Sequence, residues 1–301
     1  MLYLNLDKDF NPYNATKKDN TAASLISWRG VSKDSTTFPS GEPQFKLVDR
    51  MFKLGATGLS ALDAVITTRI RSFNDLGLLL AAVDVLRNNF CEKIGLVLPY
   101  FPGGRQDRRS SPREPLTVKI YTDIINSMGF EFVKIFDAHS DVTTALLNKV
   151  FNTKNHWYAL EALTDINNFN MLIPDSGARK RCNSLANFLR KNGKNFEIVQ
   201  CEEIRNPLNG RFAGYEVNSN DLQGKPCVII DDICDNDRQF IGIAKRAQER
   251  NAGTQHLIVS HGIFSKGTIE LNKYFDSITS TDSFYSEVEG VKIINLNEQL
   301  L

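Results

Sequence analysis

The apolar residues of this chain change their spacing repeatedly, from short continuous runs to longer segments with apolar residues on one face. Short runs are typical of buried strands, and one-sided segments are typical of helices that cover a sheet. Their alternation predicts an α/β fold with mainly parallel sheets, because parallel neighbours need a crossover connection. The expected strands are residues 94–101, 132–136, 171–173, 196–199, 227–230 and 257–259, and the expected helices are residues 75–89, 115–128, 178–191 and 240–250.

The length of the chain predicts two domains. A chain of 301 residues with 42% hydrophobic content can bury more than one core, since a domain typically holds about 100–200 residues. The polar segment 148–156 is the candidate boundary, so we expect domains at residues 1–155 and 156–301. In the last expected helix, four residues fall on one face and predict its buried side: Phe240, Ile243, Ala244 and Ala247.

The composition argues against a broad nucleic-acid or membrane surface. The chain has 36 basic and 35 acidic residues and a formal charge of +1, so any anion binding must be local. No apolar run approaches the roughly 20 residues of a membrane span, and the N-terminal segment lacks a signal-peptide core. We therefore expect a cytoplasmic protein without nucleic-acid or membrane partners. Five cysteines without CxxC spacing and only four histidines favour buried thiols over a zinc site.

The first candidate site follows the expected strand at 94–101 and reads PYFPGGRQDRR. Ligands of open parallel sheets bind beyond the carboxyl ends of the strands. Gly103 and Gly104 permit close approach of the backbone, while Arg105 can pair with phosphates and Gln106 can hold a purine edge or a ribose. A solvated basic loop is the plain alternative.

Two further strands end in candidate polar groups. His139 of the Asp-Ala-His sequence could contact a metal–nucleotide complex or act as an acid, or it could be a hydrogen-bonded structural residue. Asp175 opens the sequence PDSGARKR and suits Mg²⁺, which proteins usually hold with one or two carboxylates plus substrate phosphates. The alternative for Asp175 is a helix cap.

Adjacent carboxylates follow the apolar run 227–230. Asp231 and Asp232 are suited to accept hydrogen bonds from the 2- and 3-hydroxyls of a ribose, and Asp235 lies in the same loop. A plain turn would use the same residues. Each of the four segments is ambiguous alone, whereas their order along one chain is much more specific.

Together the four segments, with the later sequence SHGIFSKG, resemble the ribose-phosphate pyrophosphokinase (phosphoribosyl pyrophosphate synthetase) family over residues 38–268. The resemblance implies two phosphoribosyltransferase-like α/β domains, each a mainly parallel sheet flanked by helices. It implies an ATP side in the N-terminal domain and a ribose-acceptor side in the C-terminal domain. The family's reaction moves the β,γ-diphosphoryl group of Mg²⁺-ATP to the C1 hydroxyl of ribose 5-phosphate and releases AMP.

The resemblance also assigns roles to matching positions. ATP contacts are expected from Phe38, Glu42, Arg105, Gln106, Asp107, Arg109 and His139. Acceptor contacts are expected from Asp175, Asp231, Asp232, Asp235, Asn236, Arg238 and Gln239. Mg²⁺ is expected near His139 and Asp175, and the catalytic set is His139, Lys180, Arg181 and Arg205.

The sequence Phe38-Pro39-Ser40-Gly41-Glu42 resembles the family's hairpin, which reaches the ATP of a neighbouring subunit. This implies a homo-oligomer built on dimers, and the family commonly forms hexamers. Ser40 stands where the family has an acid, which could weaken an adenine contact. Glu203 aligns with the catalytic-loop lysine of the family, so charge stabilisation must come from other cations: Arg205, Lys180, Arg181 or Arg211.

The third departure from the family is the loop 235–239, which reads DNDRQ instead of a glycine- and threonine-rich phosphate cradle. Such a cradle wraps a 5-phosphate with amides at a helix N-terminus. Two unit charges about 4 Å apart interact by about 4 kcal/mol at an effective dielectric of about 20. Asp237 facing a phosphate dianion could therefore weaken binding by a factor on the order of a thousand, and Arg238 could offset part of that.

Three hypotheses follow for the acceptor. In the favoured one, the acceptor is ADP-ribose, whose 5-phosphate is already esterified, and the product is ADP-ribose 1-pyrophosphate for NAD⁺ synthesis. In the second, ordinary ribose 5-phosphate gives phosphoribosyl pyrophosphate, with Arg238 replacing the glycine loop. In the third, the chain is a non-catalytic regulatory homologue. Retention of Arg105, His139 and Asp175 argues against the third, and the missing lysine argues for it.

Overall fold

The computed structural model describes residues 2–7, 9–10, 12, 38–46, 63–88, 91–205 and 211–297. The chain divides into two compact units, which are described separately. The N-terminal unit comprises Met1–Lys154 with Leu296–Leu301, and the C-terminal unit comprises Asn155–Asn295.

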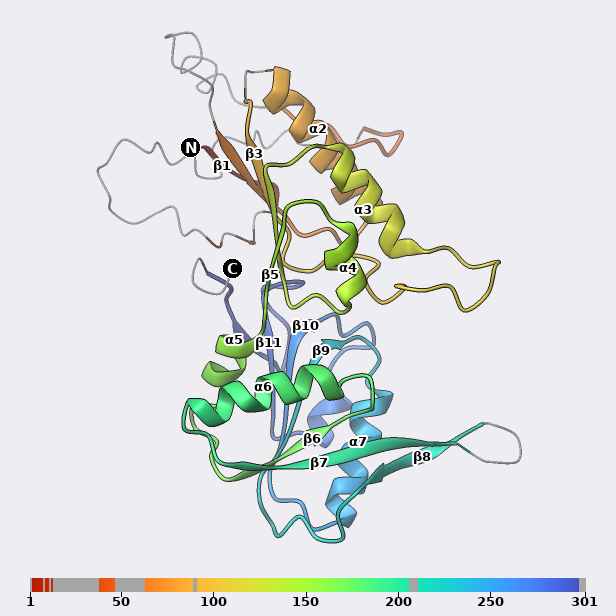
Figure 1. The fold of residues 1–301 in the computed structure, drawn as a ribbon, viewed down its shortest axis with the longest axis vertical. Helices are drawn as coiled ribbons and strands as arrows, with labels where there is room; N and C mark the ends of the chain where they lie inside the picture. The colour runs from red at the N-terminus through yellow and green to blue at the C-terminus, as the bar shows by residue number, and fades with distance from the viewer. Residues whose placement is uncertain are drawn as a thin grey trace. The chain divides into compact units, whose positions relative to one another are not determined.

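The N-terminal unit is built on a five-stranded sheet in the order β1-β2-β3-β4-β5, in which every neighbouring pair is parallel. Consecutive strands are therefore always neighbours, and helices make the crossovers from β2 to β5 (Figure 1). The strands are β1 Leu2–Asn5, β2 Ala64–Thr67, β3 Ile94–Val97, β4 Phe132–Phe136 and β5 Val150–Thr153. The helices are α2 Phe73–Asn88, α3 Thr117–Ser127 and α4 Asp141–Leu146.

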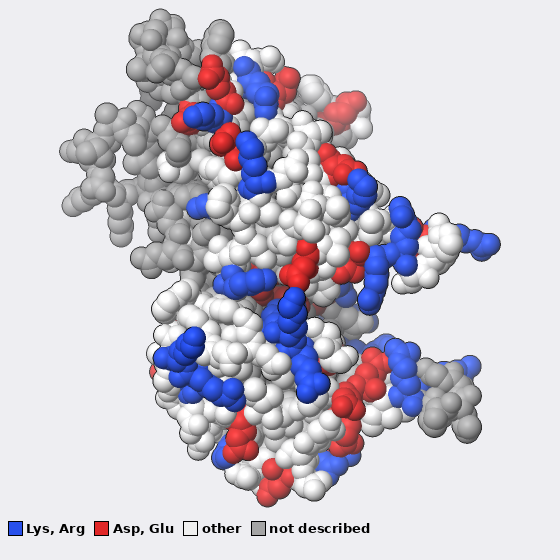
Figure 2. All heavy atoms as spheres, viewed as in Figure 1, with Lys and Arg blue, Asp and Glu red and all other residues white. Residues whose placement is uncertain are grey.

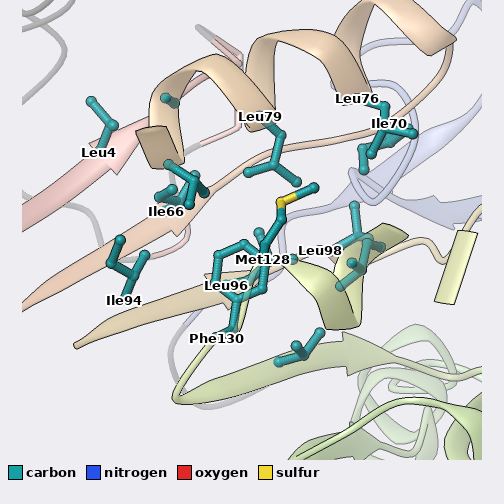
Figure 3. Packing of buried hydrophobic residues seen from close by; sticks show 14 of the residues in the cluster. Leu4, Ile66, Ile70, Leu76, Leu79, Ile94, Leu96, Leu98, Met128 and Phe130 are labelled. Atoms are coloured by element: carbon teal, nitrogen blue, oxygen red, sulfur yellow. The ribbon is translucent and has the colours of Figure 1, made fainter. Parts of the chain in front are cut away.

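The core of this unit lies between the sheet and its helices (Figure 3). Leu79 of α2 and Leu96 of β3 are fully buried and contribute to one apolar cluster. Gly95 permits close packing at the centre of the sheet, because a Cβ atom there would lie 2.2 Å from the ring of Phe132. Burial of this apolar surface is the main stabilising contribution to such a unit.

A buried ion pair joins the ends of β1 and β2. The Nε and Nη2 atoms of Arg69 donate to the two carboxylate oxygens of Asp7 at 2.7 and 2.8 Å. Burial raises the pKa of Asp7, but the hydrogen bond and charge of Arg69 outweigh it, so that the pKa lies below its ordinary value. The pair fixes the position at which the first two strands leave the sheet.

The C-terminal unit is built on a seven-stranded sheet in the order β12-β11-β10-β9-β6-β7-β8. From β6 the chain first adds β7 on one side and later adds β9 on the other, so the strand order reverses between β6 and β9. In open α/β sheets such a reversal marks the ligand crevice. The strands are β6 Phe169–Ile173, β7 Phe196–Arg205, β8 Phe212–Val217, β9 Cys227–Cys234, β10 Gln255–Gly262, β11 Ser277–Thr281 and β12 Lys292–Ile294. The helices are α5 His156–Ala162, α6 Arg179–Lys191 and α7 Arg238–Glu249, with a 3₁₀ turn η2 at Leu271–Lys273.

Strands β7 and β8 form a long hairpin, the one antiparallel pair among the described strands. The first half of β7 pairs with β6, whereas its second half pairs only with β8 and is largely exposed. This ribbon extends beyond the rest of the sheet (Figure 1). Its side chain Tyr215 packs against helix α7, where a Cβ atom on Gly242 would lie 2.1 Å from the Tyr215 ring.

The structure confirms most of the expected elements and corrects several of their ends. Strand 132–136 has the predicted bounds, and all four residues predicted on the buried face of α7 are buried. Strand β3 ends at Val97 instead of residue 101, before Pro99 and Pro102, which have no backbone N–H for a strand ladder.

Strand β9 is longer than the expected 227–230 and continues to Cys234, so Asp231 and Asp232 lie inside the strand rather than after it. The prediction failed because the apolar run ends at Ile230, whereas backbone pairing with β10 continues. Register partners there include Val259 with Asp231 and His261 with Ile233.

All five cysteines are free and buried, as expected. Among the described residues, no helix combines the length and apolar character needed to cross a membrane. The cytoplasmic location stays a prediction.

Candidate functional site

The loop after β3 forms a pocket at the carboxyl edge of the N-terminal sheet. Gly103 adopts a φ of 73°, and its carbonyl accepts a hydrogen bond from the Gln106 amide at 3.0 Å. A Cβ atom on Gly103 would lie 2.8 Å from Thr117, so this turn requires glycine. The pocket has a volume of about 420 Å³ and is lined by Tyr100, Gly103, Arg105 and Gln106.

His139 lies beside this pocket. The chain leaves β4 through Asp137, which has a φ of 40°, and the Ala138 amide donates to the Asn152 side chain at 3.1 Å. A Cβ atom on Gly104 would lie 3.7 Å from His139 Cβ. The loops after β3 and β4 therefore meet, and they bring Arg105, Gln106 and His139 to one edge of the sheet, as predicted.

Two other predicted ATP contacts are placed differently. Asp107 and Arg109 do not line the pocket. The Nε of Arg109 donates to the Glu114 carbonyl at 3.2 Å, so this side chain braces its own loop. The loop carries several basic side chains, among others that are spread over the same face (Figure 2).

The predicted hairpin at 38–42 is formed in the structure. The Phe38 amide donates to the Glu42 carbonyl and the Gly41 amide to the Phe38 carbonyl, both at 2.8 Å. The Ser40 hydroxyl donates to the Glu42 carboxylate, so Ser40 orients the remaining acid. Phe38 is 47% exposed, available to a further contact. Its role at a neighbouring subunit stays a prediction.

In the C-terminal unit, Asp175 follows β6 at the reversal of strand order. Its Oδ1 accepts the amide of Ala178, the N-cap residue of α6, at 2.9 Å, so Asp175 supports the turn before the helix rather than capping the helix itself. Its Oδ2 accepts Nε2 of Gln239 at 3.0 Å. Each oxygen retains a further lone pair that a cation could use.

The two adjacent acids of β9 are buried and bound to one guanidinium. Nη2 of Arg181 lies 2.9 Å from Asp232 Oδ1 and also contacts Asp231 Oδ1. The Asp232 amide donates to Asp231 Oδ1 at 2.9 Å, which turns the Asp231 carboxylate along the strand end. Burial and the Asp232 charge raise the pKa of Asp231 well above its ordinary value, although Arg181 opposes this rise.

The altered loop after β9 uses its own side chains to begin helix α7. Asn236 Oδ1 accepts the amide of Arg238 at 3.1 Å, and Asp237 is the N-cap residue. The Asp235 carbonyl accepts a hydrogen bond from Ser265 at 3.2 Å. The Arg238 amide, which a phosphate cradle would offer to its ligand, is therefore already hydrogen-bonded within the loop. The Asp237 carboxylate lies at the N-terminus of α7, where it interacts favourably with the helix dipole.

The remaining predicted cations lie on exposed elements. Arg205 is at the end of β7, and its Nη2 pairs with Glu203 Oε1 at 2.7 Å. Lys180 is exposed on the first turn of α6. Burial raises the pKa of Tyr215, and the charges of Glu203 and Asp175 add to this rise, whereas Arg238 opposes it. The hairpin thus carries an acid and a cation close to the candidate acceptor site.

Sequence reasoning missed the two contacts that join the β6–α6 segment to the β9–α7 segment. Arg181 comes from α6 and reaches the acids of β9, and Gln239 comes from α7 and reaches Asp175. We call this pair of contacts the double clasp. The partners are separated by 50 and 64 residues along the chain, so no local pattern could indicate them.

The carboxylate of Asp175 suits an Mg²⁺ ion that substrate phosphates also bind. In the described part of the chain, no three His, Cys, Asp or Glu side chains converge as a metal cage. Mg²⁺ is usually held by only one or two carboxylates, with phosphates and water completing its octahedron. Asp175, with its free lone pairs at the strand edge, has the chemistry for this role, while the proposed metal contact of His139 stays a prediction.

The sequence of this chain is similar to those of known proteins. Residues 64–129 match the family model of the N-terminal domain of ribose phosphate pyrophosphokinase. A ribose-phosphate pyrophosphokinase of Ureaplasma parvum is 27% identical over 234 residues, which cover 72% of this chain and 68% of the relative. A putative ribose-phosphate pyrophosphokinase 2 of Streptococcus pneumoniae serotype 4 is 29% identical over 261 residues, covering 81% and 78%.

These matches support membership of the ribose-phosphate pyrophosphokinase family. The crystal structure of phosphoribosylpyrophosphate synthetase from Mycobacterium smegmatis shares its fold, with a TM-score of 0.70 and 18% identity over 87% of this chain and 85% of that one. The predicted α/β fold with two phosphoribosyltransferase-like domains is thereby confirmed.

Proposed function

We propose that this chain is an ATP-dependent diphosphotransferase that moves the β,γ-diphosphoryl group of ATP to the C1 hydroxyl of a ribose 5-phosphate moiety. Family membership and the names of the relatives support this reaction type. The observation that carries the proposal is the position of three acids on neighbouring strands where the strand order reverses: Asp175 follows β6, and Asp231 and Asp232 lie in the last half of β9. Such a place is the expected ligand crevice of an open parallel sheet.

The proposed reaction needs no covalent enzyme intermediate. The C1 hydroxyl oxygen attacks the β-phosphorus, the bond from that phosphorus to the oxygen shared with the α-phosphate breaks, and AMP leaves with that oxygen. The hydroxyl proton passes to solvent. Phosphoryl-type transfer depends on positioning and charge stabilisation, and Mg²⁺ bound with ATP would supply charge neutralisation at the phosphates.

The residues of the chain would divide this work. Arg105 and Gln106 would hold the nucleotide at the pocket of the N-terminal unit. Asp231 and Asp232 would accept the ribose hydroxyls, and the positive charge of Arg181 favours their ionised form. Asp175 would bind the cation beside them.

Ribose 5-phosphate is the acceptor that the comparisons support best, because the relatives that match are named ribose-phosphate pyrophosphokinases. The comparisons therefore favour the ordinary reaction over ADP-ribose. Under this proposal the product is phosphoribosyl pyrophosphate, and Arg238, exposed at the start of α7, would neutralise the 5-phosphate.

ADP-ribose is kept as a second candidate on one specific observation. The Arg238 amide is already bonded to the Asn236 side chain, and the Asp237 carboxylate lies at the N-cap. A phosphate dianion would have to break the bond between the Arg238 amide and Asn236 and approach the Asp237 carboxylate. The phosphate on the acceptor ribose of ADP-ribose is part of a pyrophosphate and carries only one negative charge, so Asp237 would repel it less.

Incubation with Mg²⁺ and ATP, and measurement of AMP release with each acceptor, tests both candidates. AMP released with ribose 5-phosphate supports the first candidate, and AMP released with ADP-ribose alone supports the second. Absence of AMP with either acceptor would contradict the enzymatic proposal and support a regulatory homologue. Asp175→Asn should reduce the rate at least about 10-fold, while the exposed control Asp165→Asn should leave it unchanged.

The family resemblance further leads us to propose a homo-oligomer in which the hairpin at Phe38–Glu42 meets a neighbouring subunit's ATP. The exposed ring of Phe38 supports this, since adenine could stack on it.

A further inference from the structure

We infer that Gln239 is a positioning residue that fixes the Asp175 carboxylate for metal binding and thereby couples the altered loop to the cation site. This inference rests on the proposed role of Asp175 in binding Mg²⁺ with ATP. It assigns Gln239 to the metal side of the site, instead of the acceptor side expected from its position in the sequence.

The Asp175 carboxylate is held from two directions. Its Oδ2 accepts Nε2 of Gln239 at 3.0 Å, and its Oδ1 accepts the Ala178 amide at 2.9 Å. The same Gln239 nitrogen lies 3.4 Å from the Pro174 carbonyl. Gln239 therefore contacts both the backbone and the side chain of the β6 loop. Two donors on different oxygens select one orientation of the carboxylate.

Helix α7 presents Gln239 from a fixed base. The next residue, Phe240, is buried, and so are Ile243 and Ala244 one turn later. Strands β6 and β9, which carry the two loops, are direct neighbours in the sheet. The Gln239 amide therefore approaches Asp175 from a rigid helix rather than from the loop itself, as accurate positioning of a ligand requires.

A primary amide is well matched to this task. It donates to the carboxylate without adding a charge, so it neither displaces a cation nor repels the acid. A lysine or arginine at the same place would compete with Mg²⁺ for Asp175, and a carboxylate would repel it. Mg²⁺ demands near-ideal octahedral geometry, so loss of orientation should lower its affinity. Partners that orient metal ligands typically contribute about 10-fold to 100-fold in metal affinity.

The test uses Gln239→Met, which keeps the size of the side chain but cannot donate a hydrogen bond. Mn²⁺ is the probe, and its binding to the full chain in the presence of ATP is measured from its electron paramagnetic resonance signal. We expect the variant to weaken Mn²⁺ binding about 10-fold and to raise the Mg²⁺ concentration needed for half-maximal AMP release. The KM for the ribose acceptor should stay unchanged. Gln248→Met, on the exposed end of the same helix, is the matched control.

Asp175→Asn separates the two ways in which the test could fail. Wild-type Mn²⁺ affinity in Gln239→Met together with weakened affinity in Asp175→Asn would overturn the positioning role and leave the proposed function intact. Wild-type affinity in Asp175→Asn would overturn the metal role of Asp175 and, with it, the positioning role. A raised acceptor KM with unchanged Mn²⁺ binding would assign Gln239 to the acceptor alone.

A second variant tests the contact without metal or substrate. In Gln239→Glu, a carboxylate would face Asp175 among the charged groups of the β6 and β9 loops and the hairpin: Arg181, Asp231, Asp232, Glu203 and Arg238. Repulsion between the introduced carboxylate and Asp175 raises the pKa of the pair. The two groups share a proton at low pH, and they repel each other once that proton is lost at higher pH. We expect the thermal midpoint of this variant to fall below that of the wild type progressively as pH rises. A pH-independent difference would show that the two side chains do not face each other.

Discussion

The two acids of β9 are buried carboxylates stabilised by one cation, and this arrangement determines how they can work. Asp231 and Asp232 are 7% and 3% exposed. Two like charges at such a site oppose each other's ionisation, whereas Arg181 favours it. The sequence predicted their proximity to a ligand edge, but it could not predict Arg181 as their partner, because Arg181 lies in a different strand–helix unit of the chain.

Asp231→Asn should change the pH dependence of stability. The folded-state pKa of Asp231 lies above the ordinary 3.8, so its contribution to folding is fully present below the unfolded pKa and is lost as pH rises through the folded pKa. Asparagine does not titrate. As pH rises, the wild type should therefore lose free energy of unfolding relative to the variant, by about 1.4 kcal/mol for each unit by which the pKa of Asp231 is raised. Urea unfolding of both proteins between about pH 4 and pH 8 measures this difference.

The exposed acid Asp123 of α3 provides the control, since Asp123→Asn should show no comparable trend. A constant difference between Asp231→Asn and the wild type across this range would contradict the raised pKa.

Arg181→Met should destabilise the C-terminal unit strongly, because it leaves two buried acids without their cation. Removal of one partner from a buried ion pair typically costs about 3–5 kcal/mol, and we expect the lower part of that range because Arg181 is 22% exposed. Urea unfolding measures the effect. Arg179→Met, exposed in the same helix, should change stability little, and the double variant with Asp231→Asn should recover part of the loss. Additive losses would show that Arg181 and Asp231 are not coupled.

At the scale of elements, the helices were more predictable than the strand ends. Helix α6 begins one residue after the predicted start, because the one-sided apolar pattern defines it directly. Strands β7 and β9 extend past their apolar runs, since each continues by pairing with a neighbour that the sequence does not reveal. The candidate site depends on these extensions, which place Arg205 on the hairpin and Asp231 within the sheet.

The contact between α7 and the hairpin gives a prediction at this scale. Gly242→Ala should destabilise the protein by about 1–3 kcal/mol, although alanine favours helices, because the new Cβ would lie 2.1 Å from the Tyr215 ring. Urea unfolding again measures the change. Combination with Tyr215→Ala should remove the penalty of the added methyl group, and an unchanged penalty would contradict the packing between α7 and β8.

At the scale of the whole molecule, the two units share a fold class but not a strand order. The order of the N-terminal sheet follows the chain, so its pocket arises from loops after the neighbouring strands β3 and β4. The order of the C-terminal sheet reverses between β6 and β9. Apolar periodicity predicted the α/β class of both units, because burial leaves a local signal in many of their strands and helices. Strand order leaves no such signal, since it is decided by contacts between distant segments.

The double clasp has a consequence for how the specificity of this protein could change. Each of the two segments contacts the other through one side chain. Arg181 of α6 binds Asp232 of β9, and Gln239 of α7 binds Asp175 after β6. A chimera that received only residues 236–239 from a relative would lose Gln239 and so disturb the orientation of Asp175 in a segment that was never exchanged. Residues 174–181 and 235–239 therefore depend on each other. A chimera should take on the acceptor preference of the relative only when both segments are exchanged together.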